Sequence, residues 1–380
     1  MNRLLVGILP ILLSMLVACN SSDNDSGPPI ADEQYVNRGV IISTQTMSER
    51  LAHFNVPGVS IAVIDNFQLD WANGYGVNSV QNNLEVDTNT LFQAASISKP
   101  LAAVGALKLV ESGQLSLDTQ VNQYLTSWQL PDNGFQETAE VTLRGILSHS
   151  AGLTVHGFEG YNTQLSLPPL VNILNGQGSA NSPAIFVDTT PGSRFRYSGG
   201  GYVLLQQLVQ DITGDSFDNF MEAQVLQPIA MNNSSFEQPI SQAMQANIAS
   251  GHSSNGSEVT GQWHNYPEQA AAGLWTTPSD LTSFAIALAN AYRGESNTLL
   301  SENLAREMLT RQKDNWGLGI KIGLNGQVVS FSHGGANEGF RCYLFMNATT
   351  GQGLVVMTNS DAGDFLITEL LDQFSTAYQW

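Results

Sequence analysis

Strand-like runs lie near both ends of this chain of 380 residues, and the long segment between them has mostly helical patterning. Near the start, GVSIAVIDNFQLDWANGYG alternates apolar and polar residues around Asp65-Asn66, which is typical of a hairpin. Near the end, QVVSFSHGG, FRCYLFMN and GLVVMTNS predict three short strands, and residues 364–380 have helical spacing. The pattern predicts an α+β fold: the two terminal segments form one antiparallel sheet, flanked by helices, with a mostly helical region inserted at about 115–310.

Two more helices are expected near the start of the chain. Residues from about 32 to 54 have a helical pattern. Residues 97–112 also predict a helix, and Gly113 is a natural left-handed cap for its end.

The segment FQAASISKPL places Lys99 in a small, apolar run, although the whole chain has only four lysines. Residues three apart on a helix share a face, so Ser96 and Lys99 can touch. A serine needs a base to become a nucleophile, and lysine is such a base only when its pKa falls well below about 10.4. Apolar burial and a helix N-terminus both lower a lysine pKa. The pair is therefore a candidate nucleophile and base, although a bare S-x-x-K also occurs as a surface serine with a solvated lysine.

Two other segments strengthen the catalytic interpretation. PGSRFRYSGGGYVLL places Tyr197 before a Gly-rich turn that leads into a helix, and VVSFSHGGANEGF places His333 and two glycines at the end of a strand. With Ser96 and Lys99, they resemble the S-x-x-K, Y-x-N and K-T-G motifs of the serine β-lactamase and penicillin-recognising superfamily. Longer blocks in the same order are similar to the class C β-lactamase-like branch, which includes family VIII esterases and D-aminopeptidases. The resemblance covers residues 36–380 and implies a β-lactamase/transpeptidase-like fold.

The resemblance implies a role for each matching residue. Ser96 is the acylating nucleophile and Lys99 its proton acceptor. Tyr197 passes a proton to the leaving group and later activates water, which would require a phenolate stabilised by the nearby Lys99. The backbone N–H groups of Ser96 and Ala336 form the oxyanion hole. No cofactor and no metal are implied.

Two positions depart from the β-lactamase pattern. Gly199 stands where β-lactamases usually have asparagine, and His333-Gly334-Gly335 replaces K-T-G. These four residues are the substrate-binding candidates. A neutral histidine binds a substrate carboxylate poorly, so β-lactam hydrolysis is expected to be weak or absent. Arg341, on the next strand-like run, either restores a positive charge or forms a structural ion pair.

The N-terminal segment predicts export. MNRLLVGILPILLSMLVAC has a positive start and an apolar stretch too short to span a bilayer comfortably. Its end resembles the lipobox of bacterial lipoproteins, which implies a signal peptide at 1–18, lipid on Cys19, a polar tether at 19–35 and a hydrolase domain at 36–380. Asn20 after the cysteine favours the outer membrane, facing the periplasm. Apart from this lipid anchor, no membrane contact is expected.

Composition limits the partners. The 33 acidic and 14 basic residues give a formal charge of −19, and the absence of a Lys/Arg-rich cluster in the sequence argues against nucleic acid. Cys342 lies alone in a strand-like run and is expected to be a small core residue. A monomer acting on a small ester, amide or peptide is predicted. His149, in SHSAGL, is interpreted as structural, and the loops around 155–190 and 250–272 are expected to set specificity.

The leading functional hypothesis is a serine hydrolase that cleaves esters through an acyl-enzyme. The alternative within the same chemistry is a D-amino-acid or cell-wall peptidase or amidase. The alternative of another class is a non-catalytic lipoprotein that binds penicillin or peptidoglycan.

Overall fold

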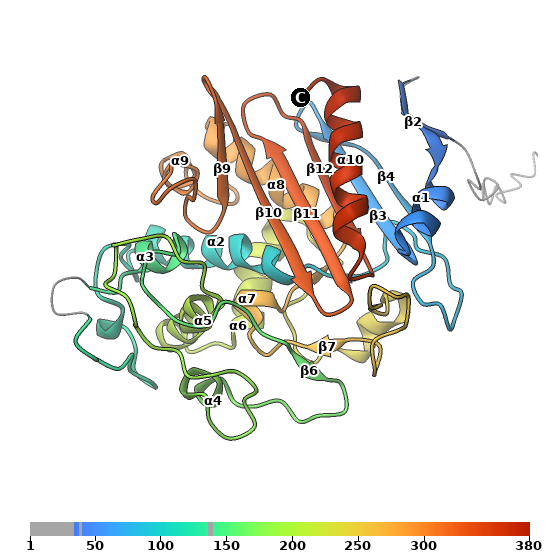
Figure 1. The fold of residues 1–380 in the computed structure, drawn as a ribbon. Coiled ribbons are helices and arrows are strands. Elements are labelled where there is room, and N and C mark those ends of the chain that lie inside the picture. Colours follow the sequence, from blue (N-terminus) through green and yellow to red (C-terminus); the bar gives the residue numbers. More distant parts are fainter. Residues whose placement is uncertain (1–33, 38–39, 136–139) are drawn as a thin grey trace, which may run out of the picture.

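The computed structural model describes residues 34–37, 40–135 and 140–380, and these are built around one antiparallel sheet of six strands (Figure 1). The sheet order is β4-β3-β12-β11-β10-β9. The strands are β3 (Gly58–Asp65), β4 (Gln68–Gly76), β9 (Lys321–Asn325), β10 (Val328–Asn337), β11 (Phe340–Asn347) and β12 (Gly353–Thr358). Because β3 pairs with β12, the N-terminal hairpin and the C-terminal strands form one sheet, which confirms the predicted fold class.

The predicted hairpin is present, with its turn at the expected place. Asn66 and Phe67 link β3 to β4 with φ of 50° and 60°. Two successive residues with positive φ match the right-handed twist of the flanking strands, and asparagine tolerates this conformation better than most residues.

Helices cover both faces of the sheet (Figure 1). On one face α10 (Gly363–Tyr378) packs against β11 and β12 and meets α1 (Met47–Phe54), and they enclose a small apolar core. On the other face α8 (Pro278–Arg293) packs against the central strands. Beyond it lies the inserted helical region, with α2 (Ser98–Glu111), α3 (Leu143–Leu147), α4 (Leu170–Asn175), α5 (Gly199–Thr213), α6 (Phe217–Met221), α7 (Gln269–Ala272) and α9 (Glu302–Met308).

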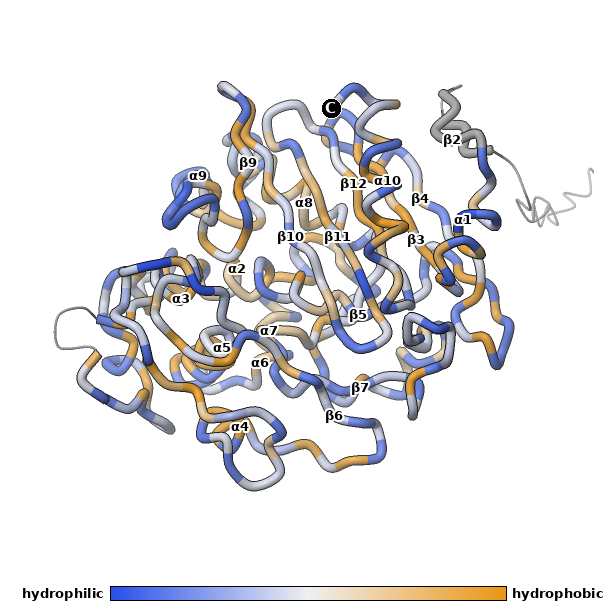
Figure 2. Tube along the Cα trace, viewed as in Figure 1, coloured by the Kyte–Doolittle hydropathy of each residue, from blue (hydrophilic) through white to orange (hydrophobic). Residues whose placement is uncertain are grey.

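The larger apolar core joins the sheet to the helical region. Hydrophobic residues run along β11, β12 and β3, whereas the peripheral loops are hydrophilic (Figure 2). The predicted helix at 97–112 is confirmed as α2, and Gly113 has the expected left-handed φ of 74°. No described helix is both long and apolar enough to cross a bilayer.

The helix predicted from about residue 32 to 54 is wrong in its first part. The chain forms strands β1 (Gln34–Asn37) and β2 (Val40–Thr46) before α1 begins at Met47. Two local features explain this. The run Val40-Ile41-Ile42 is β-branched and favours a strand. Thr46 and Glu49 form a capping box, which sets the start of the helix.

The predicted signal peptide, the lipid-bearing Cys19 and most of the tether lie outside the described residues. Lipidation and localisation therefore stay predictions.

Candidate active site

Ser96 lies at the start of the first long helix, in a strained turn. It is the middle residue of a short 3₁₀ segment (Ala95–Ile97) that runs directly into α2. Ala95, just before it, has a φ of 49°, a left-handed conformation that costs free energy for a residue with a Cβ. Such strain is characteristic of functional sites, where the surrounding structure imposes it.

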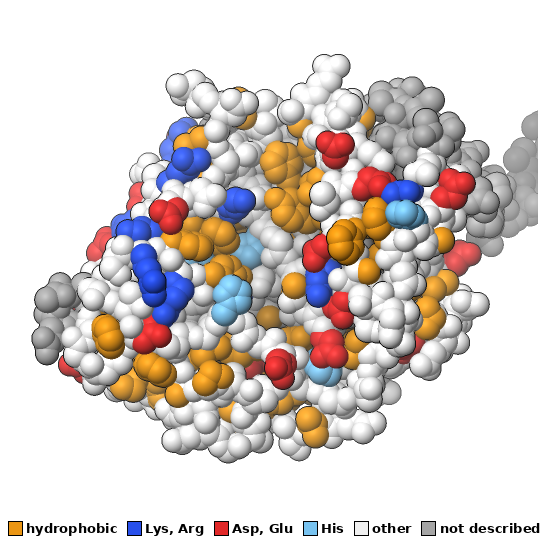
Figure 3. All heavy atoms as spheres, viewed as in Figure 1, with side chains coloured by type: hydrophobic (Ala, Val, Ile, Leu, Met, Phe, Trp, Pro, Cys, Tyr) orange, Lys and Arg blue, Asp and Glu red, His pale blue; other side chains and the backbone are white. Residues whose placement is uncertain are grey.

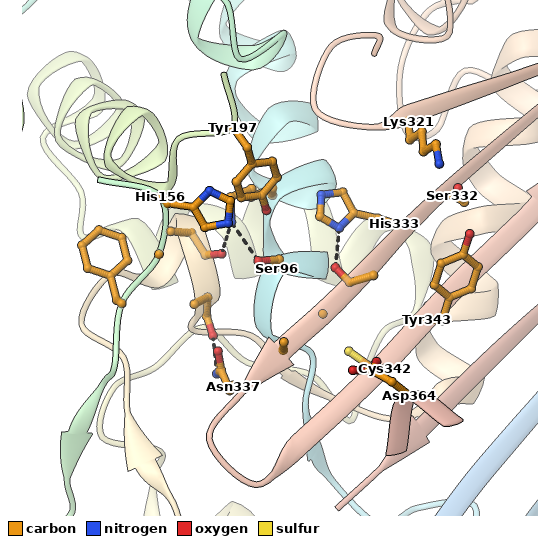
Figure 4. Close-up of a pocket in the computed structure, with 18 of the residues that line it drawn as sticks. Ser96, His156, Tyr197, Lys321, Ser332, His333, Asn337, Cys342, Tyr343 and Asp364 are labelled. Carbon is orange, nitrogen blue, oxygen red and sulfur yellow. Dashed lines mark hydrogen bonds between the residues drawn. The ribbon is translucent and has the colours of Figure 1, made fainter. Parts of the chain in front are cut away.

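Ser96 faces a cleft of about 670 Å³ between the helical region and β10. The cleft is visible as a hollow on the face shown in Figure 3, with hydrophobic and histidine side chains on its walls. Ser96, Tyr197 and His333 point into the same space from three different segments (Figure 4). The structure thus brings together three residues that are far apart in sequence.

Lys99 is buried beside Ser96 and has the properties of a base. Its Nζ lies 3.0 Å from Ser96 Oγ and donates a hydrogen bond of 2.8 Å to the carbonyl oxygen of Ala271. The side chain is only 2% exposed, and this burial lowers the pKa of Lys99 to about 7. A large fraction of the amine is therefore neutral near pH 7, with a lone pair available to the Ser96 hydroxyl.

Tyr197 stands over this pair and keeps its proton at rest. Lys99 Nζ lies 4.9 Å from the centroid of the Tyr197 ring. Burial raises the pKa of Tyr197 above its usual value, although a hydrogen bond with Ser96 opposes this shift. The buried phenol is therefore neutral in the resting protein, and the phenolate that proton transfer would require during the reaction stays a prediction.

His149 supports Tyr197 from behind. The two rings are stacked with centroids 4.2 Å apart. His149 Nδ1 accepts a hydrogen bond of 3.1 Å from the backbone N–H of Ser198, so the proton of the neutral ring is on Nε2. Burial, followed by the charge of Lys99, lowers the pKa of His149 well below its usual value. His149 thus stays neutral and fixes the ring of Tyr197, consistent with the structural interpretation.

The wall opposite Tyr197 is a free strand edge. β9 pairs with β10 only as far as Ser332, which lies opposite Lys321. From His333 onward, no strand of the described residues pairs with the edge of β10 that faces away from β11, and this edge lines the cleft.

The register of β10 directs Ala336 toward this open edge. A two-residue turn closes the β10–β11 hairpin on the pair Asn337 and Phe340. Alternate residues of an antiparallel strand direct their N–H groups to the same side, so those of Gly334 and Ala336 point away from β11 and into the cleft. This direction of the Ala336 N–H is compatible with a place in the oxyanion hole, which stays a prediction.

Gly335 and Cys342 form a tightly packed floor under this wall. A Cβ on Gly335 would overlap the carbonyl oxygen of Ala94 and the sulfur of Cys342, so only glycine fits. Cys342 is buried, and its Sγ donates to Ala94 O at 3.0 Å, which confirms it as a core residue.

The other substrate-binding candidates occupy different surroundings. His333 lines the cleft, and burial lowers its pKa to about 3, so it carries no charge. Gly199 is buried at the start of α5 and does not line the cleft. Its N–H donates to His156 O at 3.0 Å, and a Cβ there would press on the ring of Phe158.

Arg341 is held in structural ion pairs. Its guanidinium lies 2.8 Å from Asp361 and 3.3 Å from Asp364, and it donates to the carbonyl oxygens of Asn337 and Phe340. Of the two alternatives that the sequence left open, the ion pair is therefore the one observed. Arg341 secures the β10–β11 turn to α10.

Several residues that line the cleft were not singled out as site residues by the sequence. His156 and Phe158 enter from the loop after α3, and Phe195 and Trp316 form an aromatic wall beside Tyr197. The ring centroids of His156 and Tyr197 are 5.0 Å apart. Val155, next to His156, has a φ of 64°, which is costly for a β-branched residue. This strain would have indicated a functional loop, but it can be seen only in the backbone and not in the sequence.

Glu268 is a buried carboxyl group under α7, the short helix that carries Ala271. It is fully buried, and neither carboxyl oxygen is hydrogen-bonded to another residue of the described chain. Burial raises its pKa from 4.5 to about 8.

Between pH 4.5 and about 8 the Glu268 carboxyl group loses its proton in the unfolded chain but keeps it in the folded protein, so the free energy of unfolding falls as pH rises. At pH 7 this loss amounts to up to about 3 kcal/mol. We expect Glu268→Gln to flatten the dependence of melting temperature on pH between about 4.5 and 8.

Glu85→Gln provides the control, because it makes the same chemical change at an exposed carboxyl group. This variant should keep the pH dependence of the native protein. Equal pH profiles for native protein and Glu268→Gln would contradict the prediction.

Comparisons with known proteins agree with this geometry. The sequence profile of the Beta-lactamase family matches residues 44–373, and the chain therefore belongs to that family, whose members are serine hydrolases. The matched range contains Ser96, Lys99, Tyr197 and His333. The resemblance inferred from the motifs is confirmed.

Individual relatives are distant but extensive. Protein flp of Staphylococcus aureus (strain NCTC 8325 / PS 47) is 25% identical over 324 residues, which are 80% of this chain and 60% of that protein. Unguisins hydrolase ungD of Aspergillus violaceofuscus is 24% identical, over 93% of this chain and 66% of its own length. The crystal structure of D-amino acid amidase from Ochrobactrum anthropi SV3 superposes with a TM-score of 0.69 at 21% identity, over 87% of this chain and 95% of that one. The chain thus spans about three fifths of the length of Protein flp. The structural similarity to the amidase shows that the two chains share a fold.

Proposed function

We propose that this protein is a serine hydrolase that acts through an acyl-enzyme on Ser96 and that its substrates are esters. The observation that carries the proposal is the amine of Lys99, which is buried, has a pKa of about 7 and lies 3.0 Å from Ser96 Oγ. A neutral amine in contact with a hydroxyl is the arrangement that general-base activation of a nucleophile needs.

In the first half of the reaction, Ser96 Oγ bonds to the carbonyl carbon while Lys99 takes the hydroxyl proton. The negative charge on the carbonyl oxygen is stabilised by the N–H groups of Ser96 and Ala336. Tyr197 gives its proton to the departing alcohol and is reprotonated by Lys99. In the second half, the same groups act in reverse on water, which releases the acid and restores Ser96.

The surroundings favour esters over β-lactams. Aromatic side chains line much of the cleft beside Ser96: Phe158, Phe195, Tyr197, Trp316 and Tyr343. His333 is neutral, so this position offers no cation to the carboxylate of a β-lactam. We therefore expect slow β-lactam turnover.

The alternative is an amidase or peptidase of the same Ser-Lys-Tyr type. It gains support from the names of two similar proteins, an unguisins hydrolase and a D-amino acid amidase. Ester and amide hydrolysis differ in how strongly the leaving amine must be protonated, and the neutral phenol of Tyr197 can donate to either leaving group.

One experiment tests the proposal. The protein without its N-terminal segment should hydrolyse a short-chain p-nitrophenyl ester and be labelled by a fluorophosphonate, and Ser96→Ala should lose both properties. Ser112→Ala, the same change at the far end of α2, should keep them. Labelling without ester turnover would redirect the search to D-amino-acid amides. Absence of labelling would indicate the non-catalytic binding protein.

A further inference from the structure

The cleft continues past Ser96 onto the α10 face of the sheet. It passes the open edge of β10 at Gly334, which has no side chain to block the way, and reaches a second group of residues. We call this part the outer arm, and it is lined by Lys321, Ser332, Gly334, Tyr343, Asp364 and Ile367. Figure 4 shows Lys321, Ser332 and Tyr343 beside one another beyond His333.

Lys321 is the unpaired charge of the outer arm. It is the first residue of β9 and lies directly opposite Ser332, so both side chains project from the same face of the sheet. Its side chain is exposed, and no hydrogen bond or ion pair joins its ammonium to any residue that the structure describes. The acidic residue of the arm, Asp364, is already paired with Arg341.

Other cations stand on the same side of the cleft. The chain has a formal charge of −19 and only 14 basic residues, yet Figure 3 shows Lys and Arg gathered along one wall of the hollow. Arg194 and Arg196 flank Phe195 in the sequence, and Lys313 donates a hydrogen bond of 2.9 Å to Gly192 O. Arg196 is ion-paired with Asp188, and none of these three cations lines the cleft itself. Lys321 is the exposed cation of the lining, and positive charge at a cleft in an acidic protein attracts anionic ligands.

We propose that Lys321, with the hydroxyl of Ser332 beside it, binds a carboxylate of the substrate while the reacting carbonyl lies at Ser96. This inference rests on the proposed ester hydrolysis and names its substrate class as anionic esters. An ammonium and a hydroxyl side by side supply charge-assisted and neutral donors to the two oxygens of one carboxylate. Lys321 is thus a specificity residue and takes no part in bond breaking.

The strand register also sets the length of the substrate. Ser332 lies four residues along β10 from Ala336, which is about 13 Å at the rise of a β-strand. The carboxylate must therefore be separated from the reacting carbonyl by a chain that spans most of this distance. Long dicarboxylic half-esters fit this requirement, whereas short ones do not reach Lys321.

The test uses p-nitrophenyl half-esters of succinic, glutaric and suberic acids, each beside its neutral methyl diester analogue. Native protein should prefer the charged suberate ester over its neutral analogue by up to about fivefold in kcat/KM, and this preference should shrink with added salt. Lys321→Met should abolish the preference through KM and leave the neutral ester within about twofold. Lys321→Arg should retain the preference, and Lys108→Met, a lysine outside the cleft, should change neither ester.

The outcomes separate this inference from the proposed function. Equal losses for charged and neutral esters in Lys321→Met, or no preference in native protein, would overturn the role of Lys321. If native protein hydrolyses neither the charged nor the neutral esters, the proposed function fails instead. The affinity for suberate, measured by calorimetry, then tests whether Lys321 binds an anion. Weaker binding by Lys321→Met than by native protein supports the anion site, and equal binding contradicts it.

Discussion

Replacement of Lys99 by methionine is expected to lower kcat/KM for a p-nitrophenyl ester by about 10³-fold or more, because the Ser96 hydroxyl then has no base in contact. In native protein, kcat/KM should rise as pH increases through about 7, since Lys99 must lose its proton before it can accept one. The residual activity of the variant should lack this rise. The measurement is a pair of kcat/KM profiles between about pH 5 and 9.

Lys108→Met is the matched control for this experiment. Lys108 lies on the same helix, α2, but its Nζ contacts Thr298 O at 3.4 Å, away from the cleft. This variant should keep both the activity and its pH profile. If the rise near pH 7 persists in Lys99→Met, another group acts as the base. His156, on the cleft wall beside Tyr197, is then the next candidate.

Local sequence signals predicted the parts of the fold that depend on neighbouring residues. The β3–β4 hairpin was predicted from the alternation of apolar and polar residues around Asp65-Asn66. The end of α2 was predicted from Gly113, which has the positive φ that glycine tolerates. The short strand β9 was missed because KIGLN combines a charge, a glycine and an asparagine, and its pairing with β10 alone makes it a strand. Tertiary pairing supplied what propensity did not.

The residues of the candidate site also fall into those that the sequence predicted and those that only the tertiary structure brings to the cleft. Ser96 and Lys99 were found from their three-residue spacing, and Tyr197 and His333 from motifs in a fixed order. By contrast, Lys321 faces the cleft only because β9 ends opposite Ser332, a matter of register. His156 reaches the cleft through the strained backbone at Val155. Neither position can be read from residue types alone.

Replacement of Tyr197 by phenylalanine is expected to reduce kcat/KM according to the leaving group. A p-nitrophenolate leaves without a proton, whereas an alkoxide must be protonated as it departs. Because the buried phenol of Tyr197 holds its proton at rest, its loss should cost about tenfold for a p-nitrophenyl ester and more than about 10²-fold for an alkyl ester of the same acid. The stacking of the phenylalanine ring on His149 should keep the wall of the site in place.

Tyr202→Phe makes the same chemical change at a second buried tyrosine close to Lys99. The centroid of its ring lies 5.6 Å from Lys99 Nζ, but its hydroxyl donates to Leu147 O at 3.2 Å and does not face the cleft. We expect this variant to lose stability and to affect both esters equally. A leaving-group dependence confined to Tyr197→Phe would identify Tyr197 as the proton donor. Equal losses for both esters in Tyr197→Phe would instead assign the hydroxyl to orienting Ser96, since that contribution does not depend on the alcohol that leaves.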